Sequence, residues 1–396
     1  MIFRINIICY LLLSLSFLQS NSLNNFAFEL FKVINNQKDE NVLISPLSVS
    51  YALMMVNKGA SGNTSDNILS TLNINSDDLD QHYSLIKDYT DNLAKKNLSI
   101  NNGIWIHEDN CYSPNRQYIS FIDSIFKGDI FYVDFAKNSI NLIEDINNWV
   151  FDATYGMIDD IVSENDIKAT TVQALLNAVY FKAQWSIPFD STKTKLDYFN
   201  MGINQKQVYM MNKKNRYPYY YNEEFQLLEL QYVDTDISMF IFLPNSNQNL
   251  NSFINDFNFS TLISSIDSLK IKPGNIFIPM FKNEASYSLK EPLQSMGMNI
   301  PFSAKLASFD GFWNYNYNCF KESPVHYIDL INHKTNIDLD ENGVEVAAAT
   351  SVIINRITSI SPFIEPFIFK ANRPFLYLIY DKEYNKIIFI GKYIGV

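Results

Sequence analysis

Few side chains of this chain are placed where catalysis or metal binding would require them. The sequence contains no Gly-x-Ser-x-Gly nucleophile elbow, no His-Glu-x-x-His pair, no glycine-rich phosphate loop and no Cys-x-x-Cys. The four histidines, none of which has a metal-ligand neighbour at useful spacing, are His82, His107, His326 and His333. We therefore expect a protein that is not an enzyme and that binds no metal ion or other cofactor.

A different chemistry is possible near the C-terminal end, where one cationic side chain follows an apolar tract. Ten consecutive uncharged residues run from Val346 to Asn355, and Arg356 follows them. Arg356 is the only basic residue between Glu341 and Lys370. A guanidinium presented in this way can form a charge-assisted, bidentate pair with a carboxylate of another molecule.

The stretch Asp340–Ile357, which carries this arginine, alternates with a period of two. One alternate set is uncharged and small or β-branched, and the intervening set is more polar, as in a strand with one buried face. The two sets are Val344, Val346, Ala348, Thr350, Val352 and Ile354, and Glu345, Ala347, Ala349, Ser351, Ile353 and Asn355. Gly343 would let the backbone turn before such a strand, whereas the three consecutive alanines would also suit a helix. Taken alone, the stretch is most simply a permanent core strand, but it could also stand outside as a loop.

The residues after Arg356 favour an exposed connection. Thr358–Pro366 contains two prolines and no helical period. Long irregular segments of this kind in compact domains are most often functional or disordered. The tract is therefore a candidate functional loop.

Length and composition are those of a large globular domain. The 396 residues are 47% hydrophobic and 18% charged, and no linker, charge block or fixed-period repeat divides them. A single domain is the better expectation, although length alone would allow two or three. The net charge of -11 argues against nucleic acids and against anionic membrane surfaces as partners.

Residues 1–22 predict a secretory signal peptide. Arg4 precedes an apolar run from Ile5 to Leu18, and Ser20 and Ser22 offer a small-residue cleavage site. The run is short for a retained membrane anchor, and no later segment is apolar for long enough to span a bilayer. We expect a secreted, extracellular protein whose mature domain is residues 23–396.

Because we expect the protein to be exported, disulfide bonding and N-glycosylation are both relevant to it. Cys9 would leave with the signal peptide, and Cys111 and Cys319 could be bridged or free. The Asn-x-Ser/Thr acceptor pattern predicts a glycoprotein with three candidate sites, which are Asn63, Asn97 and Asn258.

Hydrophobic periodicity predicts helices mainly early in the chain and strands mainly late. Helices are expected at 24–35, 47–56, 64–72, 115–126, 139–154, 250–257, 262–269 and 289–296. Strands are expected at 42–44, 98–107, 130–135, 171–181, 276–282, 374–380 and 387–393, with several more between 209 and 243. The fold class is therefore α+β with a large mixed sheet.

Short motifs stand along the chain in a fixed order. They are Phe26–Phe31, Ser45–Ser48 with Gly59–Gly62, Ile146–Gly156, Asn177–Trp185, Met239–Pro244, Gly297–Met298, His333–Lys334, Glu341–Thr350 and Asn372–Leu376. No single motif is specific, but in this order and spacing they resemble the serpin family over essentially the whole mature chain. The resemblance implies the serpin fold, with about eight or nine helices around a large mixed main sheet, smaller sheets, and an exposed reactive-centre loop at about 341–366.

The resemblance also implies that the stretch Asp340–Ile357 is first an exposed loop and later a strand of the main sheet. The loop would offer a bait bond to a target serine protease. After cleavage, while the acyl-enzyme persists, the hinge would insert as a new strand and distort the protease in a covalent complex. The hinge residues are Glu341, Gly343, Val344, Glu345, Val346, Ala347, Ala348, Ala349 and Thr350.

By the same resemblance, a polar shutter lies beneath the opening strands and a tryptophan lies at the breach where insertion starts. The shutter residues are Ser45, Ser48, Asn177 and His333, and the breach residue is Trp185. Two positions depart from the family pattern. Val346 stands where inhibitory members favour alanine, which could slow insertion, and Met280 replaces a lysine that would pair with Glu341.

The bait residue depends on how the loop is counted. Counting forward from Glu341 places Ile357 before the scissile bond, with Arg356 one residue earlier, whereas counting back from Asn372–Phe375 reaches Phe363, so the loop is about six residues longer than the common pattern. If the hinge is one residue shorter, Arg356 is the bait for the carboxylate of a trypsin-like pocket. We predict Arg356–Ile357 as the reactive bond. The alternative is a chymotrypsin- or elastase-like target that uses Ile357 or Phe363.

A second class of function remains open, namely a non-inhibitory serpin that carries a ligand or acts like a chaperone. Charges or prolines in the hinge would favour it, and this hinge has only Glu345. A heparin-type cofactor is not expected, because the segment from Asn73 to Lys96 is acidic rather than basic. We expect a monomer.

Overall fold

Helical periodicity in the sequence gives nine α-helices in the part of the chain that the computed structural model describes, which is residues 22–108, 112–137, 139–315, 326–344 and 365–395. The first helix covers residues 22–35. The others are α2 (Pro46–Gly59), α3 (Gly62–Thr71), α4 (Leu79–Asn92), α5 (Arg116–Phe126), α6 (Ser139–Ala153), α7 (Leu250–Asp256), α8 (Phe259–Asp267) and α9 (Lys290–Ser295). Within these residues no helix is long and apolar enough to cross a bilayer.

The strands form a seven-stranded main sheet in the order β4-β2-β5-β14-β15-β6, with β12 beside β14. It mixes parallel and antiparallel neighbours, as predicted. Its strands are β2 (Leu98–His107), β4 (Asp129–Val133), β5 (Gln173–Phe181), β6 (Ala183–Gln184), β12 (Phe281–Ser288), β14 (Leu330–Leu339) and β15 (Gly343–Val344).

A second sheet has nine strands in the order β1-β18-β17-β10-β9-β8-β11-β16, with β7 beside β8, and β3 (Tyr112–Pro114) pairs with β13 (Trp313–Tyr315) in a third. The strands of the second sheet are β1 (Val42–Ile44), β7 (Lys195–Asn200), β8 (Gln205–Tyr221), β9 (Phe225–Gln231), β10 (Ile237–Pro244), β11 (Lys270–Pro279), β16 (Phe367–Lys370), β17 (Phe375–Asp381) and β18 (Lys386–Tyr393). This is the serpin-like α+β architecture that the sequence predicts.

The prediction of one strand over residues 276–282 was wrong. The structure ends β11 at Pro279 in the second sheet and begins β12 at Phe281 in the main sheet, so that Met280 lies between two sheets. Proline has no N–H to continue a ladder, which makes it a natural strand end. The apolar run from Ile276 continues to Phe281 across this junction, so hydrophobicity alone does not reveal that the chain changes sheet.

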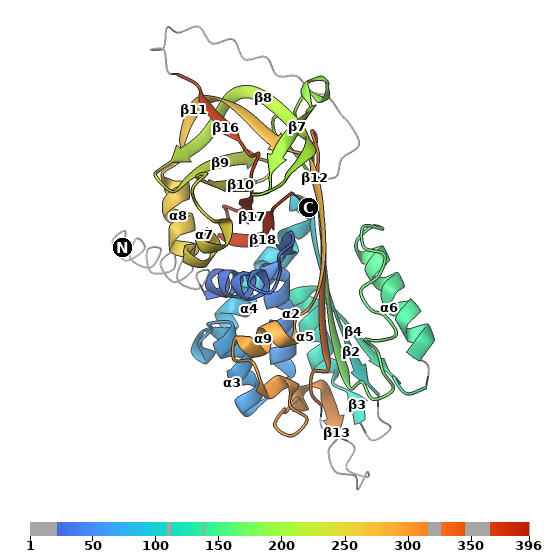
Figure 1. Cartoon of the computed structure of the whole chain (residues 1–396). Helices are drawn as coiled ribbons and strands as arrows, with labels where there is room; N and C mark the ends of the chain where they lie inside the picture. The colour runs from blue at the N-terminus through green and yellow to red at the C-terminus, as the bar shows by residue number, and fades with distance from the viewer. Residues whose placement is uncertain (1–21, 109–111, 138, 316–325, 345–364, 396) are drawn as a thin grey trace, which may run out of the picture.

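Helices cover the two faces of the main sheet unequally. Figure 1 shows α2 and α5 on one face and α6 on the other. Pro46 is the first residue of α2, and every residue of this helix except Lys58 is buried. The strand β5 is mostly apolar because it is covered on both sides: Leu175 and Val179 pack in the cluster that contains α2, and Ala174, Leu176 and Ala178 pack against α6.

A connection from α6 crosses the main sheet and is fastened to it by polar side chains. Asn147 on α6 donates to the carbonyl of Val162 at 2.9 Å, and its Oδ1 accepts from the backbone N–H groups of Ile161 and Val162 at 2.9 and 3.2 Å. From the sheet, Asn332 on β14 donates to the Ile161 carbonyl at 2.9 Å, and the Lys334 ammonium lies 2.8 Å from the Asp160 carboxylate. Residues 157–162 therefore form a strap over β14, tied to the helix and to the sheet.

We predict that Asn147→Ala lowers the free energy of unfolding by about 2 kcal/mol, because one carbonyl and two N–H groups of the strap lose their partner. The adjacent exposed residue gives a matched control, Asn148→Ala, for which we expect a change below about 0.5 kcal/mol. The denaturation midpoints of the two variants in urea make the comparison. Equal midpoints would show that the strap does not depend on this side chain.

Candidate functional site

The start of the predicted hinge is already seated at one end of the main sheet. Gly343 and Val344 form the short strand β15, which pairs antiparallel with β14 through Leu339 on one side. On its other side β15 pairs antiparallel with β6, with Val344 opposite Ala183 and Gly343 opposite Gln184. The hinge therefore enters between the ends of two strands that run parallel to each other.

Below β15 these two strands meet directly. β5 and β14 are parallel neighbours, in register from Ala174 opposite Leu330 to Val179 opposite Thr335. The pairing stops there, and β15 occupies the space between β14 and β6, which continues from β5 after Lys182. A chain that continued from Val344 in the same direction would run antiparallel to both strands and would have to part them.

Gly343 is required by the closeness of this fit. Its φ is +151°, and a Cβ at this position would lie 2.1 Å from the Ala183 carbonyl oxygen. Asp340 holds the preceding turn, because its Oδ1 accepts from the backbone N–H groups of Asn342 at 2.7 Å and Gly343 at 3.0 Å. The sequence Asp-Glu-Asn-Gly therefore encodes a turn that delivers the hinge into the sheet.

Trp185, the predicted breach residue, lies beside the turn that precedes β15. Its backbone N–H donates to the Asn342 carbonyl at 2.8 Å, and its indole Nε1 donates to the Asp340 carbonyl at 3.0 Å. Its ring stacks on Tyr232, with centroids 4.6 Å apart and an angle of 11° between the planes. The tryptophan thus fixes the turn that precedes β15.

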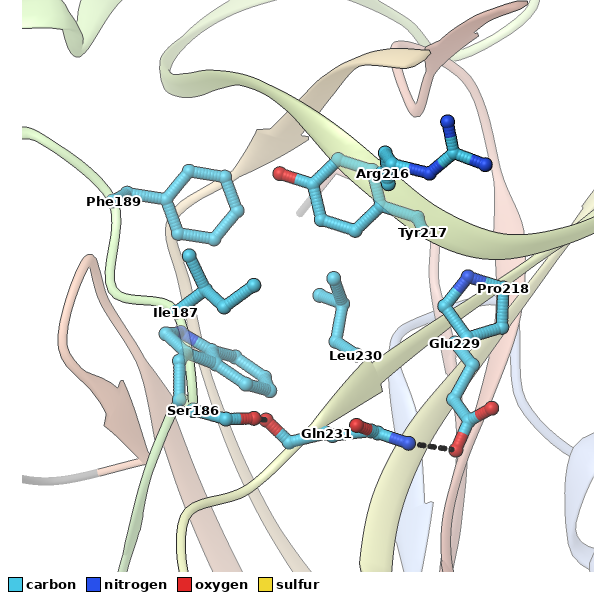
Figure 2. Close-up of a pocket in the computed structure, with 10 residues that line it drawn as sticks. Ser186, Ile187, Phe189, Arg216, Tyr217, Pro218, Glu229, Leu230 and Gln231 are labelled. Atoms are coloured by element: carbon cyan, nitrogen blue, oxygen red, sulfur yellow. Dashed lines mark hydrogen bonds between the residues drawn. The ribbon is translucent and has the colours of Figure 1, made fainter. Parts of the chain in front are cut away.

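A small pocket lies behind Trp185. Figure 2 shows Phe189 and Tyr217 facing each other across it, with Leu230 below them. Its volume is about 60 Å³, well below the size of a typical ligand site. This pocket does not mark the functional site of the protein.

Glu341 has a partner that the sequence did not reveal. The hydroxyl of Thr194, just before β7, donates to the Glu341 carboxylate at 2.7 Å, and the N–H of Phe189 donates to the Glu341 carbonyl at 2.8 Å. The carboxylate is therefore hydrogen-bonded although Met280 replaces the expected lysine. Thr194 lies 147 residues away in sequence, which is why no local pattern could identify it.

Three of the four predicted shutter side chains meet beneath the junction of β5 and β14. His333 on β14 stands directly opposite Asn177 on β5, and its Nδ1 bonds to the Asn177 Oδ1. The amide of Asn177 donates to the Ser48 Oγ on α2 and to the Asn102 Oδ1 on β2. We call these four residues, His333, Asn177, Ser48 and Asn102, the polar junction. Asn102 was not predicted, since it lies in an ordinary strand pattern.

Ser45 takes part in a different way from the one expected. Its backbone N–H, not its hydroxyl, donates to the His333 Nε2 at 3.0 Å. The buried hydroxyl of Ser45 has no hydrogen-bond partner among the described residues, and it does not cap α2. Ser45 therefore contacts His333 through its main chain and not through its side chain.

These contacts fix His333 as a neutral imidazole. Because Nε2 accepts from an N–H, the proton must be on Nδ1, which then donates to Asn177. His333 is fully buried, and desolvation lowers its pKa from 6.5 to about 3, although the contact with Asn177 acts in the opposite direction. Protonation would place a charge in the core and remove the acceptor of the Ser45 N–H.

Several other predicted positions lie outside the residues that the structure describes. These are Glu345, Val346, Ala347, Ala348, Ala349, Thr350, Arg356, Ile357 and Phe363, together with Cys111, Cys319 and residues 1–21 of the predicted signal peptide. The three candidate glycosylation asparagines, Asn63, Asn97 and Asn258, are all exposed. Asn258 also caps α8, since its Oδ1 accepts from the Thr261 N–H at 3.0 Å.

The main sheet thus holds the short strand β15, at the start of the predicted hinge, between β14 and β6. A family model described as serpin (serine protease inhibitor) matches residues 21–396. The chain belongs to the serpin family.

Individual relatives agree over nearly the whole length. The leukocyte elastase inhibitor of Xenopus tropicalis is 30% identical over 392 residues, which cover 94% of this chain and 98% of that protein. Intracellular coagulation inhibitor 2 of Tachypleus tridentatus is 32% identical over 382 residues, which cover 93% and 89%. The crystal structure of a thermophilic serpin, tengpin, in the native state has a TM-score of 0.83 and 30% identity, and covers 95% of this chain and 94% of that one. The predicted serpin fold is confirmed.

The depressed pKa of His333 predicts an acid-sensitive fold. Below pH 6.5 the unfolded chain takes up a proton at this histidine while the folded chain does not. The contribution of His333 to the free energy of unfolding is therefore fully present above pH 6.5 and is lost as the pH is lowered towards 3. Between pH 8 and pH 5 the contribution lost is about 2 kcal/mol. His82, whose pKa burial lowers to about 4, adds a similar loss.

We expect His333→Gln to be less stable than the wild type at pH 8 but to lose about 2 kcal/mol less on acidification. Urea denaturation at both pH values measures the difference. Because His82 contributes a similar loss, His82→Gln should reduce the pH dependence by a similar amount, and the double variant should reduce it by about the sum of the two. An unchanged pH dependence in His333→Gln would mean that this imidazole does not stay neutral in the folded protein.

Proposed function

We propose that this protein is an exported inhibitor of serine proteases that acts as a suicide substrate. The protease serine attacks the carbonyl of the bait residue in the loop, an acyl ester forms, and the peptide bond breaks to release a new N-terminus. The loop residues on the acyl side then enter the main sheet and carry the attached protease with them. The relatives' names support the inhibitory class, because two of them are called inhibitors.

The observation that carries this proposal is the position of β15. Gly343 and Val344 already pair with β14 and β6, directly in line with the junction of β5 and β14. Insertion would exchange one parallel ladder of six residue pairs for two antiparallel ladders, one on each side of the new strand. Antiparallel pairing is slightly more stable per residue, and each added backbone bond contributes about 1 kcal/mol.

The side-chain alternation of the hinge fits the two faces of the sheet. Val344 is buried in the cluster that contains α2, so the next residues on that face would be Val346, Ala348 and Thr350. The intervening residues would face α6 and its strap. Uncharged, small side chains on the α2 face allow a strand to enter the core without burying an ion.

Insertion requires two sets of contacts to open. The bond between His333 and Asn177 joins the strands that must separate, and the strap lies across β14 on the α6 face. Both sets of contacts keep β5 and β14 paired as long as the loop is uncut. They would therefore act as the barrier that keeps the native protein ready until a protease cuts the loop.

We further propose that Arg356–Ile357 is the reactive bond and that the target is trypsin-like. The proposal rests on Arg356 being the only basic residue between Glu341 and Lys370. The name of the Xenopus relative, an elastase inhibitor, favours Ile357 or Phe363 as the alternative bait. Export and glycosylation are proposed from residues 1–22 and from the three exposed asparagines, and neither a heparin-type cofactor nor an oligomer is required.

Incubation of the purified mature protein with trypsin tests the bait. We expect a covalent complex with trypsin that survives denaturing electrophoresis and runs near the summed mass of the two proteins. We also expect a released fragment that begins at Ile357. In Arg356→Ala the complex should form about tenfold to a hundredfold more slowly, since a charge-assisted bidentate pair with the protease is lost. A complex that forms at an unchanged rate in Arg356→Ala would assign the bait to another residue, which the new N-terminus identifies.

A pair of adjacent substitutions tests insertion itself. Ala348→Arg would place a charge on the α2 face of the inserted strand, so we expect cleavage of the loop without a stable complex. Ala349→Arg has the same chemistry on the α6 face and should retain more inhibition. If both variants inhibit as well as the wild type, the hinge does not insert, and the protein is a non-inhibitory serpin that proteases merely cleave.

A further inference from the structure

A large pocket lies away from the hinge, where the second sheet meets the start of α7. Its volume is about 640 Å³, which is within the range of small-molecule sites. Its walls come from the turn between β7 and β8, the connection from β10 to α7, the start of β17 and the end of β18. The lining residues used below are Met201, Pro244, Gln248, Leu250, Arg373, Pro374, Lys392 and Ile394.

Two cationic side chains in this pocket have no carboxylate partner. The Arg373 Nε donates to the Pro244 carbonyl at 2.9 Å, and the Lys392 ammonium donates to the Lys38 carbonyl at 2.9 Å and to the Asn251 Oδ1 at 3.5 Å. Neither cation has an ion pair within 4.0 Å among the described residues. The hydrogen-bond acceptors that these two cations contact are therefore neutral oxygens.

Two other buried lysines have carboxylate partners. Lys96 lies 3.0 Å from the Asp381 carboxylate and 2.8 Å from Glu383, and Lys334 contacts Asp160 and Glu284 at 2.8 and 3.2 Å. Lys392 is only 1% exposed and lacks such a partner, as does the buried Lys386 among the described residues, although the whole chain carries a net charge of -11. What distinguishes the pocket is that two cations without an ion pair, Arg373 and Lys392, line it together.

Burial affects both groups in the same direction. Desolvation lowers the pKa of Arg373 and the pKa of Lys392, and for Lys392 the nearby carboxylates of Asp39 and Glu40 oppose the effect. Asp39 lies on the rim of the pocket and is exposed. With one rim carboxylate against two cations, the lining keeps a net charge of +1. An anion in the pocket would relieve the cost of burying these cations.

We propose that this pocket binds an organic anion with an apolar body, in which a carboxylate or a similar headgroup pairs with the Arg373 guanidinium above Lys392. The apolar side chains of Met201, Leu250 and Ile394, with two prolines, provide the surface for the body of the ligand. Arginine suits the headgroup because its planar fork can bond both oxygens of a carboxylate. The proposal does not depend on inhibitory activity.

Binding at this site would also brace the end of the loop segment. Arg373 follows β16 by three residues, and the N–H of Asn200, the last residue of β7, donates to the Asn372 carbonyl at 2.7 Å. A ligand that contacts Arg373 and Met201 would therefore bridge the two segments that this bond joins. The expected readout is a higher melting temperature of the intact protein.

Octanoate is a suitable probe, because it combines a carboxylate with an eight-carbon chain. We expect octanoate to raise the melting temperature of the purified protein and to bind in calorimetry. At equal concentration and ionic strength, octan-1-ol lacks the charge and inorganic sulfate lacks the body, so each should have a clearly smaller effect. An octanol effect equal to that of octanoate would overturn the proposal, because binding would then need no anion.

Three variants test whether octanoate binds in this pocket. In Arg373→Gln the dissociation constant for octanoate should rise about tenfold to a hundredfold, whereas Lys305→Gln removes an exposed cation outside the pocket and should change nothing. Gln248→Glu adds a carboxylate of the same shape at the rim. It should raise the melting temperature without ligand and abolish the octanoate effect, which keeps the test informative if Arg373→Gln folds poorly. Unchanged octanoate binding in both pocket variants would refute the site.

Discussion

The parallel ladder between β5 and β14 is the contact on which the rest of this structure depends. It is a ladder of six residue pairs that ends at Thr335, and four residues further along β14 Leu339 pairs with Val344 of β15. Its central cross-strand pair is polar, with His333 opposite Asn177. An apolar pair would seal the two strands together through packing alone. Here the closure depends instead on hydrogen bonds, whose strength depends strongly on geometry and protonation.

This polar junction explains how the buried contact between β5 and β14 can fix one register and still be able to open. Asn177 uses its carbonyl oxygen for His333 and its amide for Ser48 and Asn102, so one side chain joins β5 to β14, α2 and β2. A satisfied network of this kind fixes a single register, because any slip would leave buried polar atoms unpaired. The same atoms gain little net free energy from folding, since water also satisfies them in the open state. The sheet is therefore well defined when closed but not held by a large apolar contact at this seam.

The fold could be predicted from the sequence wherever one physical signal dominated. The expected strand at 98–107 has the bounds of β2, and the expected helix at 115–126 differs from α5 by one residue at its start. Prediction failed where the answer depended on residues distant in the chain. The continuous apolar run around Pro279 does not show that Met280 separates two sheets, and no residue near Glu341 indicates that Thr194 is its partner. For Ser45, side-chain chemistry could not show that its main-chain N–H makes the bond to His333.

The two ends of the loop segment are held with very different strength, and this difference gives the proposed motion its direction. The stem that follows the loop is anchored by the parallel pairing of β16 with β11, by the stacking of Phe367 on Tyr219 at 3.8 Å, and by the Lys370–Asp197 ion pair at 2.7 Å. The stem that precedes it has only the two residues of β15 in the sheet. A cut between the stems would leave the later one in place, since the ladder and the ring contact each resist its release. The earlier stem is already aligned with the β5–β14 junction, so its free end has one low-cost route, which leads into the main sheet.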